Sequence, residues 1–196
     1  MARGKNGRPE RKMKPVILVL CEGETEECYV EHLKQKYRLP IKIISRIVGQ
    51  QINQRLINRH KNELKISSKE NIDCFLMYDA DIQSVVENIK QCDAKAVLSR
   101  PCIEVWFLAH SEKVPDTDFS GDECLKRLEK VAVWKNYRKG TLSESQKIIL
   151  WENRLEATEN ISHDFTSDKA FSTVNEFVNV LEKNRQNMHY GSVLLN

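Results

Sequence analysis

The sequence has no apolar run that approaches the roughly 20 residues of a membrane-spanning helix. Its basic N-terminus precedes one short apolar segment, residues 15–21, but this segment runs directly into the polar stretch EGETEE. No small-residue cleavage site of the kind that ends a signal peptide is present there. These absences predict a cytoplasmic protein with no membrane contact.

Motifs based on cysteine and on phosphate-binding loops are also missing. The six cysteines contain no C-x-x-C pair and fit no zinc-site spacing. A chain of 196 residues has enough core to fold without disulfides, so we expect most cysteines to be small buried side chains. The chain has no G-x-x-x-x-G-K-[ST] loop, so any ATP hydrolysis would have to come from a partner.

A strong excess of one charge is absent from the chain as a whole. Lys and Arg number 31 against 28 Asp and Glu, a net charge of +3 that excludes a polycationic coat protein. Residues 1–14 nevertheless hold six basic side chains and one acidic one, which leaves the remainder at −2. We therefore expect a basic tail over residues 1–14 that adds sequence-independent contacts to nucleic-acid phosphates, followed by a single domain over 15–196.

Four short apolar segments, rich in β-branched residues, predict strands at 16–21, 41–48, 72–78 and 94–98. They are nearly continuous in hydrophobicity, which is typical of a parallel sheet covered on both faces. Helical patterns lie between them at 25–37, 50–64 and 82–92. The alternation predicts an α/β fold, a mostly parallel sheet flanked by helices, over about residues 15–110.

After residue 99 the pattern changes to helices and loops. Helices are expected at 101–110, 122–134, 143–161 and 169–184. We interpret residues 111–196 as a helical extension of the α/β core.

Glu22 follows the first predicted strand and precedes a glycine and a helix. Ligands of open α/β sheets bind beyond the carboxyl ends of the strands, and Glu22 would lie there. The acids after it, Glu24, Glu26 and Glu27, are explained by the helix dipole, which favours acids in a first turn. Glu22 precedes the helix, so the dipole explains it poorly.

Asp79 and Asp81 follow the third predicted strand, with Ala80 between them. Residues two apart in extended chain point to the same side, so the two carboxylates could enter one space. Close carboxylates need a compensating cation, and Mg²⁺ prefers one or two carboxylates together with waters and phosphate oxygens. Alternatively, Asp81 is the N-cap of the next helix. Because Glu22 ends another strand of the same predicted sheet, we expect a metal site at this edge.

Two further segments are candidates for the same site. Glu104 lies in the first turn of an apolar helix, where the dipole or the carboxylate cluster explains it equally well. Tyr137, Arg138 and Lys139 precede Gly140, where a helix is expected to end. A lysine here could instead hold a scissile phosphate.

Taken together, these pieces resemble the RloB family of bacterial phage-defence and abortive-infection proteins. The resemblance rests on five segments in the family's order: ILVLCEGETEECYVEHL (17–33), FLMYDADI (75–82), SRPCIEVWFLAH (99–110), YRK (137–139) and FSTVNEFVNVL (171–181). The first two also look like the signature pieces of Toprim domains, a glutamate after the first strand and an Asp-x-Asp after a later one.

The resemblance implies a Toprim-like core and a Mg²⁺ (or Mn²⁺) ion held by Glu22, Asp79 and Asp81. It suggests Glu104 and Lys139 as further catalytic residues and Tyr137 as a family-matched position of open role. It also implies an ATPase partner of the ABC or AAA type and leaves the oligomeric state open.

The leading functional hypothesis is a Mg²⁺-dependent nuclease that acts on RNA, for example tRNA, or on DNA in anti-phage defence under control of an ATPase. The rival is a non-catalytic sensor or adaptor that binds an ATPase or nucleic acid. A metal-dependent phosphatase or nucleotidyl transferase would use the same carboxylates, but it leaves the basic tail unexplained.

Overall fold

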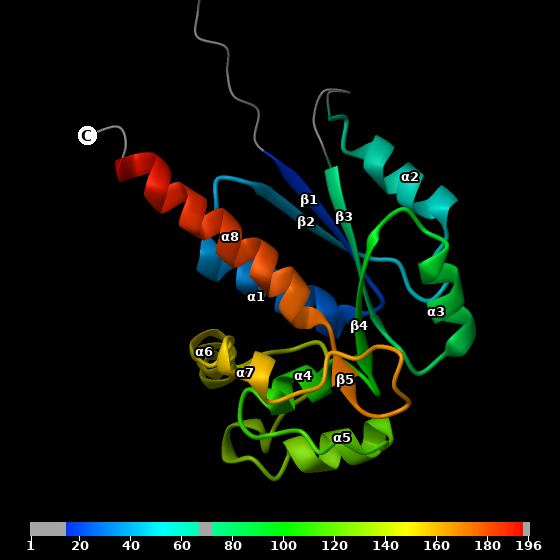
Figure 1. Cartoon of the computed structure of the whole chain (residues 1–196), viewed down its shortest axis with the longest axis vertical. Helices are drawn as coiled ribbons and strands as arrows, with labels where there is room; N and C mark the ends of the chain where they lie inside the picture. Colours follow the sequence, from blue (N-terminus) through cyan, green and yellow to red (C-terminus); the bar gives the residue numbers. More distant parts are fainter. Residues whose placement is uncertain (1–14, 67–71, 194–196) are drawn as a thin grey trace, which may run out of the picture.

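The computed structural model describes the backbone of residues 15–66 and 72–193, with side chains up to residue 187. The predicted basic tail, residues 1–14, lies outside the described residues. The fold is a mixed α/β arrangement with helices on both faces of one sheet (Figure 1). The predicted fold class is thereby confirmed.

The sheet contains five strands in the order β2-β1-β3-β4-β5. The pairs β1–β2, β1–β3 and β3–β4 are parallel, and only the short β5 is antiparallel to its neighbour. The strands are β1 (Val16–Cys21), β2 (Lys42–Ile47), β3 (Ile72–Asp79), β4 (Lys95–Arg100) and β5 (Phe171–Ser172). The carboxyl ends of β1, β3 and β4 consequently lie side by side at one end of the sheet, and ligands of such sheets bind beyond these strand ends.

Two helical layers cover the sheet because its buried strands present apolar side chains to both faces. Val19 and Phe75 pack into one core cluster, whereas Leu18 and Leu76 pack into the other. The first face is covered by α1 (Glu24–Tyr37) and α8 (Val174–Val193), and the second by α2 (Gln54–Glu63) and α3 (Gln83–Lys90) (Figure 1). Phe177 of α8 meets Phe75 edge-on, with ring centroids 5.1 Å apart.

The remaining helices gather beyond the carboxyl ends of the strands (Figure 1). They are α4 (Glu104–Ala109), α5 (Gly121–Leu128), a 3-10 turn (Ala132–Trp134), α6 (Glu144–Glu152) and α7 (Glu156–Glu159). Phe107 of α4 stacks on Trp134 with ring centroids 5.5 Å apart. This aromatic packing fixes α4, and with it Glu104, against the end of the sheet.

Several helix boundaries differ from the prediction. The helix expected over 122–134 ends at Leu128, before the separate 3-10 turn. The helix expected from residue 101 begins at Glu104. The helix expected over 143–161 is broken into α6 and α7 at Asn153, whose side chain donates to the carbonyl of His110 at 2.7 Å. The start of the expected helix 169–184 is instead strand β5, which the Ser99–Ser172 hydroxyl contact of 2.9 Å joins to β4.

All six cysteines are free, and four of them are buried, as expected of small core side chains: Cys21, Cys74, Cys102 and Cys124. None of the described helices combines the length and the hydrophobicity needed to cross a membrane.

Candidate functional site

Glu22 and Asp79 meet where β1 and β3 end. Glu22 is the first residue after β1, and its Oε2 atom accepts a hydrogen bond from the backbone N–H of Asp79 at 3.1 Å. Its Oε1 atom accepts from Nε2 of Gln50 at 2.9 Å, so a loop beyond β2 also contacts this carboxylate. The parallel pairing of β1 and β3 places these two acids at one edge of the sheet.

Asp79 is the last residue of β3, and its Oδ1 atom accepts from the N–H of Ile103 at 2.9 Å. This bond ties the strand to the segment that leads into α4. Asp81 lies differently, because the chain turns at Ala80, whose N–H donates to the carbonyl of Ser99 at 2.7 Å. Asp81 is exposed, whereas Asp79 is half-buried, and the charge of Asp81 still acts on the Asp79 carboxyl.

Glu104, the first residue of α4, is buried with 1% of its surface exposed. Its Oε1 atom accepts from the Tyr137 hydroxyl at 2.9 Å, and Nζ of Lys139 lies 3.7 Å from the same atom. Its Oε2 atom is buried without a hydrogen-bond partner in the described part of the chain. A buried carboxylate oxygen without a donor is costly, and it indicates that a cationic or donor group belongs beside it.

Glu26 also belongs to this site, although its place in the sequence is explained by the helix dipole alone. It is 5% exposed, and its Oε2 atom accepts from the N–H of Gly23 at 2.9 Å. Helical periodicity could have revealed this position, because Glu26 precedes the buried Tyr29, Val30 and Leu33 on the same face of α1. Glu24, in contrast, is exposed.

A turn after the 3-10 helix carries Tyr137 and Lys139 to Glu104. The N–H of Gly140 donates to Oγ1 of Thr25 at 3.0 Å, which fastens this turn to the first turn of α1. Gly140 has φ of +75°, and a Cβ atom there would lie 2.9 Å from Oε2 of Glu24. Both the backbone conformation and the close approach require glycine. The turn therefore positions the one lysine that contacts the buried glutamate.

We define the acid cluster as Glu22, Glu26, Asp79, Asp81 and Glu104. Burial raises the pKa of Asp79 to about 9, assisted by the charges of Glu26 and Glu104 and then of Glu22 and Asp81. Burial likewise raises the pKa of Glu26, with Glu104 and Glu22 adding to the effect. Burial and the neighbouring acids thus both disfavour ionisation of Asp79 and Glu26 when no cation is bound.

Lys139 and Tyr137 respond to the same field. Burial acts to lower the pKa of Lys139, but the attraction of Glu104 and then of Cys102 and Asp79 outweighs it and raises this pKa. Burial and the neighbouring Glu104 raise the pKa of Tyr137 well above its usual range, so this phenol remains a hydrogen-bond donor. Lys139 is thus a fixed positive charge, about half exposed, at the rim of the acid cluster.

Carboxylate oxygens are the ligands that Mg²⁺ and Mn²⁺ prefer, and Oε2 of Glu104 is buried without a hydrogen-bond partner in the described part of the chain. The donor set therefore fits a hard divalent cation. As the side chains lie, however, no three acidic, histidine or cysteine groups among the described residues are arranged to hold a metal ion. Glu22, Asp79 and Asp81 therefore do not form such a group in the arrangement that the structure describes.

Comparison with known proteins gives one match. The family model described as RloB-like protein matches residues 17–186 of the chain. No curated protein and no solved structure matches the chain. The matched region includes every residue of the acid cluster together with Tyr137 and Lys139.

Proposed function

The chain belongs to the RloB-like protein family, and from this premise we propose that it is a Mg²⁺-dependent nuclease with a Toprim-like active site that acts in anti-phage defence. The proposal is carried by the environment of Asp79, a largely buried carboxylate whose pKa rises to about 9 among four neighbouring acids. Structural ion pairs balance their charges, whereas among the described residues Lys139 is the one cation that forms an ion pair with this cluster. An uncompensated cluster at the carboxyl edge of a parallel sheet is typical of a site that takes up a cation with its substrate.

In this proposal, Glu22, Asp79 and Asp81 hold the ion, and Glu22 is also placed to accept a proton from the attacking water. A bound Mg²⁺ would polarise a phosphate oxygen and make water nucleophilic at neutral pH. Glu104 is too deeply buried to reach a large substrate, so its role is to position Lys139 and Tyr137. Lys139, exposed at the rim, would neutralise the charge that develops on the phosphate.

The expected substrate is RNA, for example tRNA, or DNA. The basic residues of the segment 1–14 would add phosphate contacts without sequence preference. An ABC- or AAA-type ATPase partner in the cytoplasm would control the activity, since the chain lacks a Walker-type loop of its own.

The test compares two isosteric variants in the same strand. Asp79→Asn keeps an oxygen that accepts from the N–H of Ile103 but removes the charge, whereas Asp73→Asn changes an exposed aspartate that pairs with Lys95. Both proteins and the wild type are incubated with mixed tRNA and with plasmid DNA in Mg²⁺, Mn²⁺ or EDTA. Each is assayed alone and with any ABC- or AAA-type ATPase that a neighbouring gene encodes.

We expect metal-dependent cleavage by the wild type and by Asp73→Asn, and a loss of at least about 100-fold in Asp79→Asn, because a metal ligand is removed. We also expect Mg²⁺ to raise the melting temperature of the wild type but not of Asp79→Asn. Cleavage that persists in EDTA or in Asp79→Asn would refute the metal-dependent nuclease.

One observation favours the second candidate, a non-catalytic adaptor. Asp81 is exposed, and no three metal-binding groups converge within the described parts of the chain. An adaptor would show no cleavage and no Mg²⁺ response, and Asp79→Asn would still support phage resistance in cells. The same three proteins therefore separate the two functions.

A further inference from the structure

Strand β2 is an edge strand, so no described strand pairs with its outer side, where the guanidinium of Arg46 donates to the carbonyl of Ser45. The N–H groups of Lys42 and Val48 donate to the carbonyls of Pro15 and Cys21, both at 3.0 Å. In a parallel ladder, alternate residues bond to the same neighbour. The residues between these, Ile43, Ser45 and Ile47, therefore direct their N–H and C=O groups outwards, and no described strand pairs with them.

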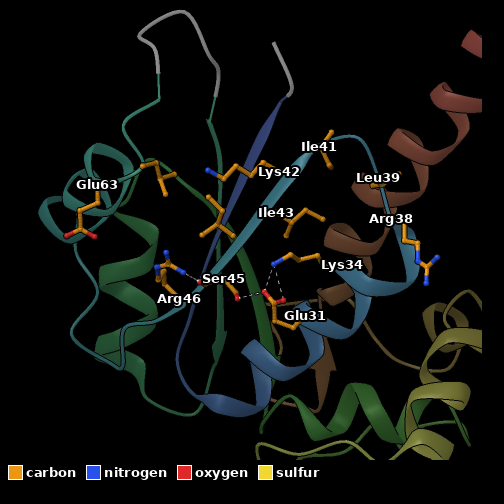
Figure 2. A pocket seen from close by; sticks show the side chains of 12 residues that line it. Glu31, Lys34, Arg38, Leu39, Ile41, Lys42, Ile43, Ser45, Arg46 and Glu63 are labelled. Carbon is orange, nitrogen blue, oxygen red and sulfur yellow. Dashed lines mark hydrogen bonds and ion pairs between the residues drawn. The ribbon is translucent and has the colours of Figure 1, made fainter. Parts of the chain in front are cut away.

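A hollow of about 700 Å³ runs along this open edge. Figure 2 shows the strand crossing the hollow, with Lys42 and Arg46 on one side of it and Ser45 and Lys34 on the other. Apolar side chains lie between the charged ones, among them Leu39, Ile41 and Leu64. Ile47, at the end of the strand, is 44% exposed. The edge therefore offers backbone partners and apolar contacts to an extended chain.

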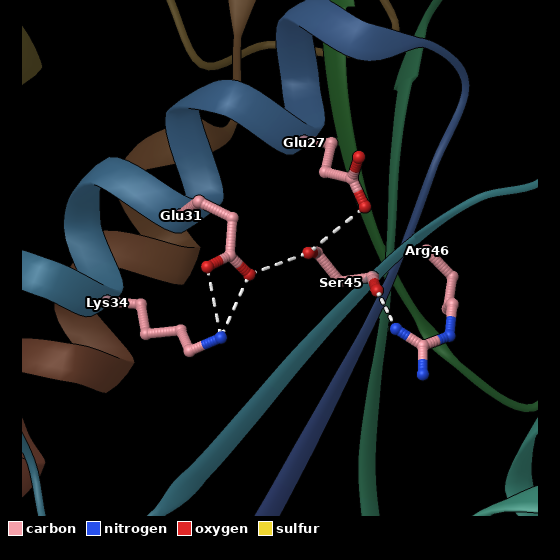
Figure 3. Close-up of polar contacts among 5 residues, drawn as sticks. All are labelled: Glu27, Glu31, Lys34, Ser45 and Arg46. Atoms are coloured by element: carbon pink, nitrogen blue, oxygen red, sulfur yellow. Dashed lines mark hydrogen bonds and ion pairs between the residues drawn. The ribbon is translucent and has the colours of Figure 1, made fainter.

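The charge of this edge is unbalanced towards positive. Lys34 is neutralised by Glu31 at 3.0 Å, and Glu63 already contacts Arg59 and His60. No described acidic side chain forms an ion pair with any of the other three cations along the hollow: Arg38, Lys42 and Arg46. Arg46 instead donates through Nη1 to the carbonyl of Ser45 at 2.8 Å (Figure 3).

The edge is also held in place before any partner arrives. The Ser45 hydroxyl is buried between Glu27 at 3.2 Å and Glu31 at 2.8 Å, both on α1 (Figure 3). These contacts fasten the strand to the helix behind it. A preformed strand loses little conformational entropy on binding, which favours association with an extended segment.

We propose that β2 is a docking edge for an acidic, extended segment of a partner protein, which adds to the sheet as a further strand. A second copy of the chain fits less well. Lys42 and Arg46 project from the same face of β2, so antiparallel pairing of two β2 strands about Ile44 places Lys42 opposite Arg46 of the other copy. Like charges directly opposite are destabilising in a sheet, whereas alternating acidic residues would meet both cations.

The test uses two synthetic peptides with opposite charge, fluorescein-labelled (Asp-Val)₄ and (Lys-Val)₄, with binding followed by fluorescence anisotropy. Three variants of the full chain are compared after circular dichroism has shown that they are folded. Ile47→Pro removes an outward N–H, and Ile47→Ala removes the same apolar surface but keeps that N–H. The double variant Lys42→Glu with Arg46→Glu reverses the charge of the edge. None of these residues belongs to the acid cluster.

We expect the wild type to bind the acidic peptide in preference to the basic one, more weakly as salt is raised. The double variant should lose at least about tenfold in affinity for (Asp-Val)₄, and Ile47→Pro should lose at least about fivefold, with a smaller loss in Ile47→Ala. If Ile47→Pro does not fold, the double variant tests the proposal alone, and an unchanged affinity for (Asp-Val)₄ would then overturn it.

Four results would overturn the proposal. Equal binding of both peptides would remove the charge argument, and equal affinity in Ile47→Pro and Ile47→Ala would remove the strand-addition argument. Failure of the wild type to bind either peptide would leave Lys42 and Arg46 as residues that only protect the edge from aggregation. A wild-type dimer that Ile47→Pro dissociates in sedimentation equilibrium would assign the edge to a second copy instead.

Discussion

The Tyr137 hydroxyl donates a hydrogen bond to Oε1 of Glu104 at 2.9 Å, and this bond joins a surface turn to the first residue of a buried helix. The other carboxylate oxygen of Glu104 has no donor within the described region. The bond therefore supplies much of the stabilisation of a charge that is 1% exposed. Loss of the Tyr137–Glu104 hydrogen bond should therefore lower the stability of the protein and displace Lys139, which lies two residues after Tyr137.

Tyr137→Phe should lower the free energy of unfolding by about 1.5–3 kcal/mol, because it leaves a buried charged acceptor without its donor. Tyr78→Phe is a matched control, since the Tyr78 hydroxyl donates at 2.8 Å to a neutral acceptor, the carbonyl of Gly49. The control should lose only about 0.5–1.5 kcal/mol. Urea denaturation measures both values, and equal losses would show that the Tyr137–Glu104 bond is worth no more than a bond to a neutral acceptor.

Asp79→Asn should stabilise the metal-free protein at pH 8. The pKa of Asp79 is raised to about 9 in the folded state, chiefly by burial, above the ordinary value for an exposed aspartate. The group therefore contributes most to stability below its unfolded pKa of about 4, and that contribution is lost as pH rises towards 9. Relative to the wild type, Asp79→Asn should gain roughly 1–3 kcal/mol at pH 8 in EDTA, since neighbouring carboxylates take up part of the protonation.

The measurement is thermal unfolding in EDTA at pH 4 and pH 8, with Asp73→Asn as the exposed control. The stabilisation of Asp79→Asn relative to the wild type should nearly vanish at pH 4, where the Asp79 carboxyl of the folded wild type is protonated. A melting temperature of Asp79→Asn that stays below the wild type at pH 8 would mean that the acid cluster is already compensated without metal.

The strands and the position of Glu22 and Asp79 could be predicted from sequence because they depend on local hydrophobicity and on the rule that parallel strands end at one edge. The structure places both residues there, joined at 3.1 Å. The exposure of Asp81 could not be predicted, because the chain leaves the strand at Ala80, whose N–H donates to the carbonyl of Ser99 on the neighbouring strand β4.

Strand β5 and the burial of Glu26 were both missed in the prediction from sequence, for two different reasons. Phe171–Ser172 form a strand only because β4 offers an edge and Ser99 a hydroxyl partner, information that the local helical pattern does not contain. The burial of Glu26, in contrast, is present in the spacing of α1. The burial of Glu26 was overlooked because the helix dipole alone already explains an acid in the first turn of α1.

Gly140→Ala should destabilise the protein and misplace Lys139. A Cβ atom at position 140 would lie 2.9 Å from Oε2 and 3.0 Å from Cβ of Glu24, and φ is +75°. Gly49→Ala is the control, because Gly49 has φ of +66° but a Cβ atom there would meet nothing within 4 Å. Both variants incur the penalty of a left-handed conformation, about 1 kcal/mol, so their difference isolates the contact with Glu24.

We expect Gly140→Ala to lose about 1–2 kcal/mol more than Gly49→Ala in urea denaturation. If the nuclease proposal holds, cleavage should also fall more in Gly140→Ala, because the turn that carries Lys139 moves away from Glu104. Similar stability of the two variants would show that the Glu24 side chain simply moves aside.

His32 is buried in α1, and its environment predicts a loss of stability in mild acid. Burial, followed by the charges of Lys36 and Lys147, lowers its pKa to about 4, and its Nε2 atom has no partner among the described residues. The unfolded chain takes up a proton near pH 6.5, whereas the folded protein takes it up only near pH 4. Stability is therefore fully present above about pH 6.5 and falls as pH drops towards 4.

His32→Gln removes this titration, so the variant should lose about 2 kcal/mol less than the wild type between pH 7 and pH 5. The comparison is made within each protein across pH, which cancels any cost of the substitution itself. Contributions from Asp79 and from His110, whose pKa burial also lowers to about 4, are common to both proteins and cancel as well. Urea denaturation at the two pH values gives the four free energies required. Identical pH dependence in the two proteins would mean that His32 has the same pKa in the folded and unfolded states, with the nearby charge of Glu144 offsetting its burial.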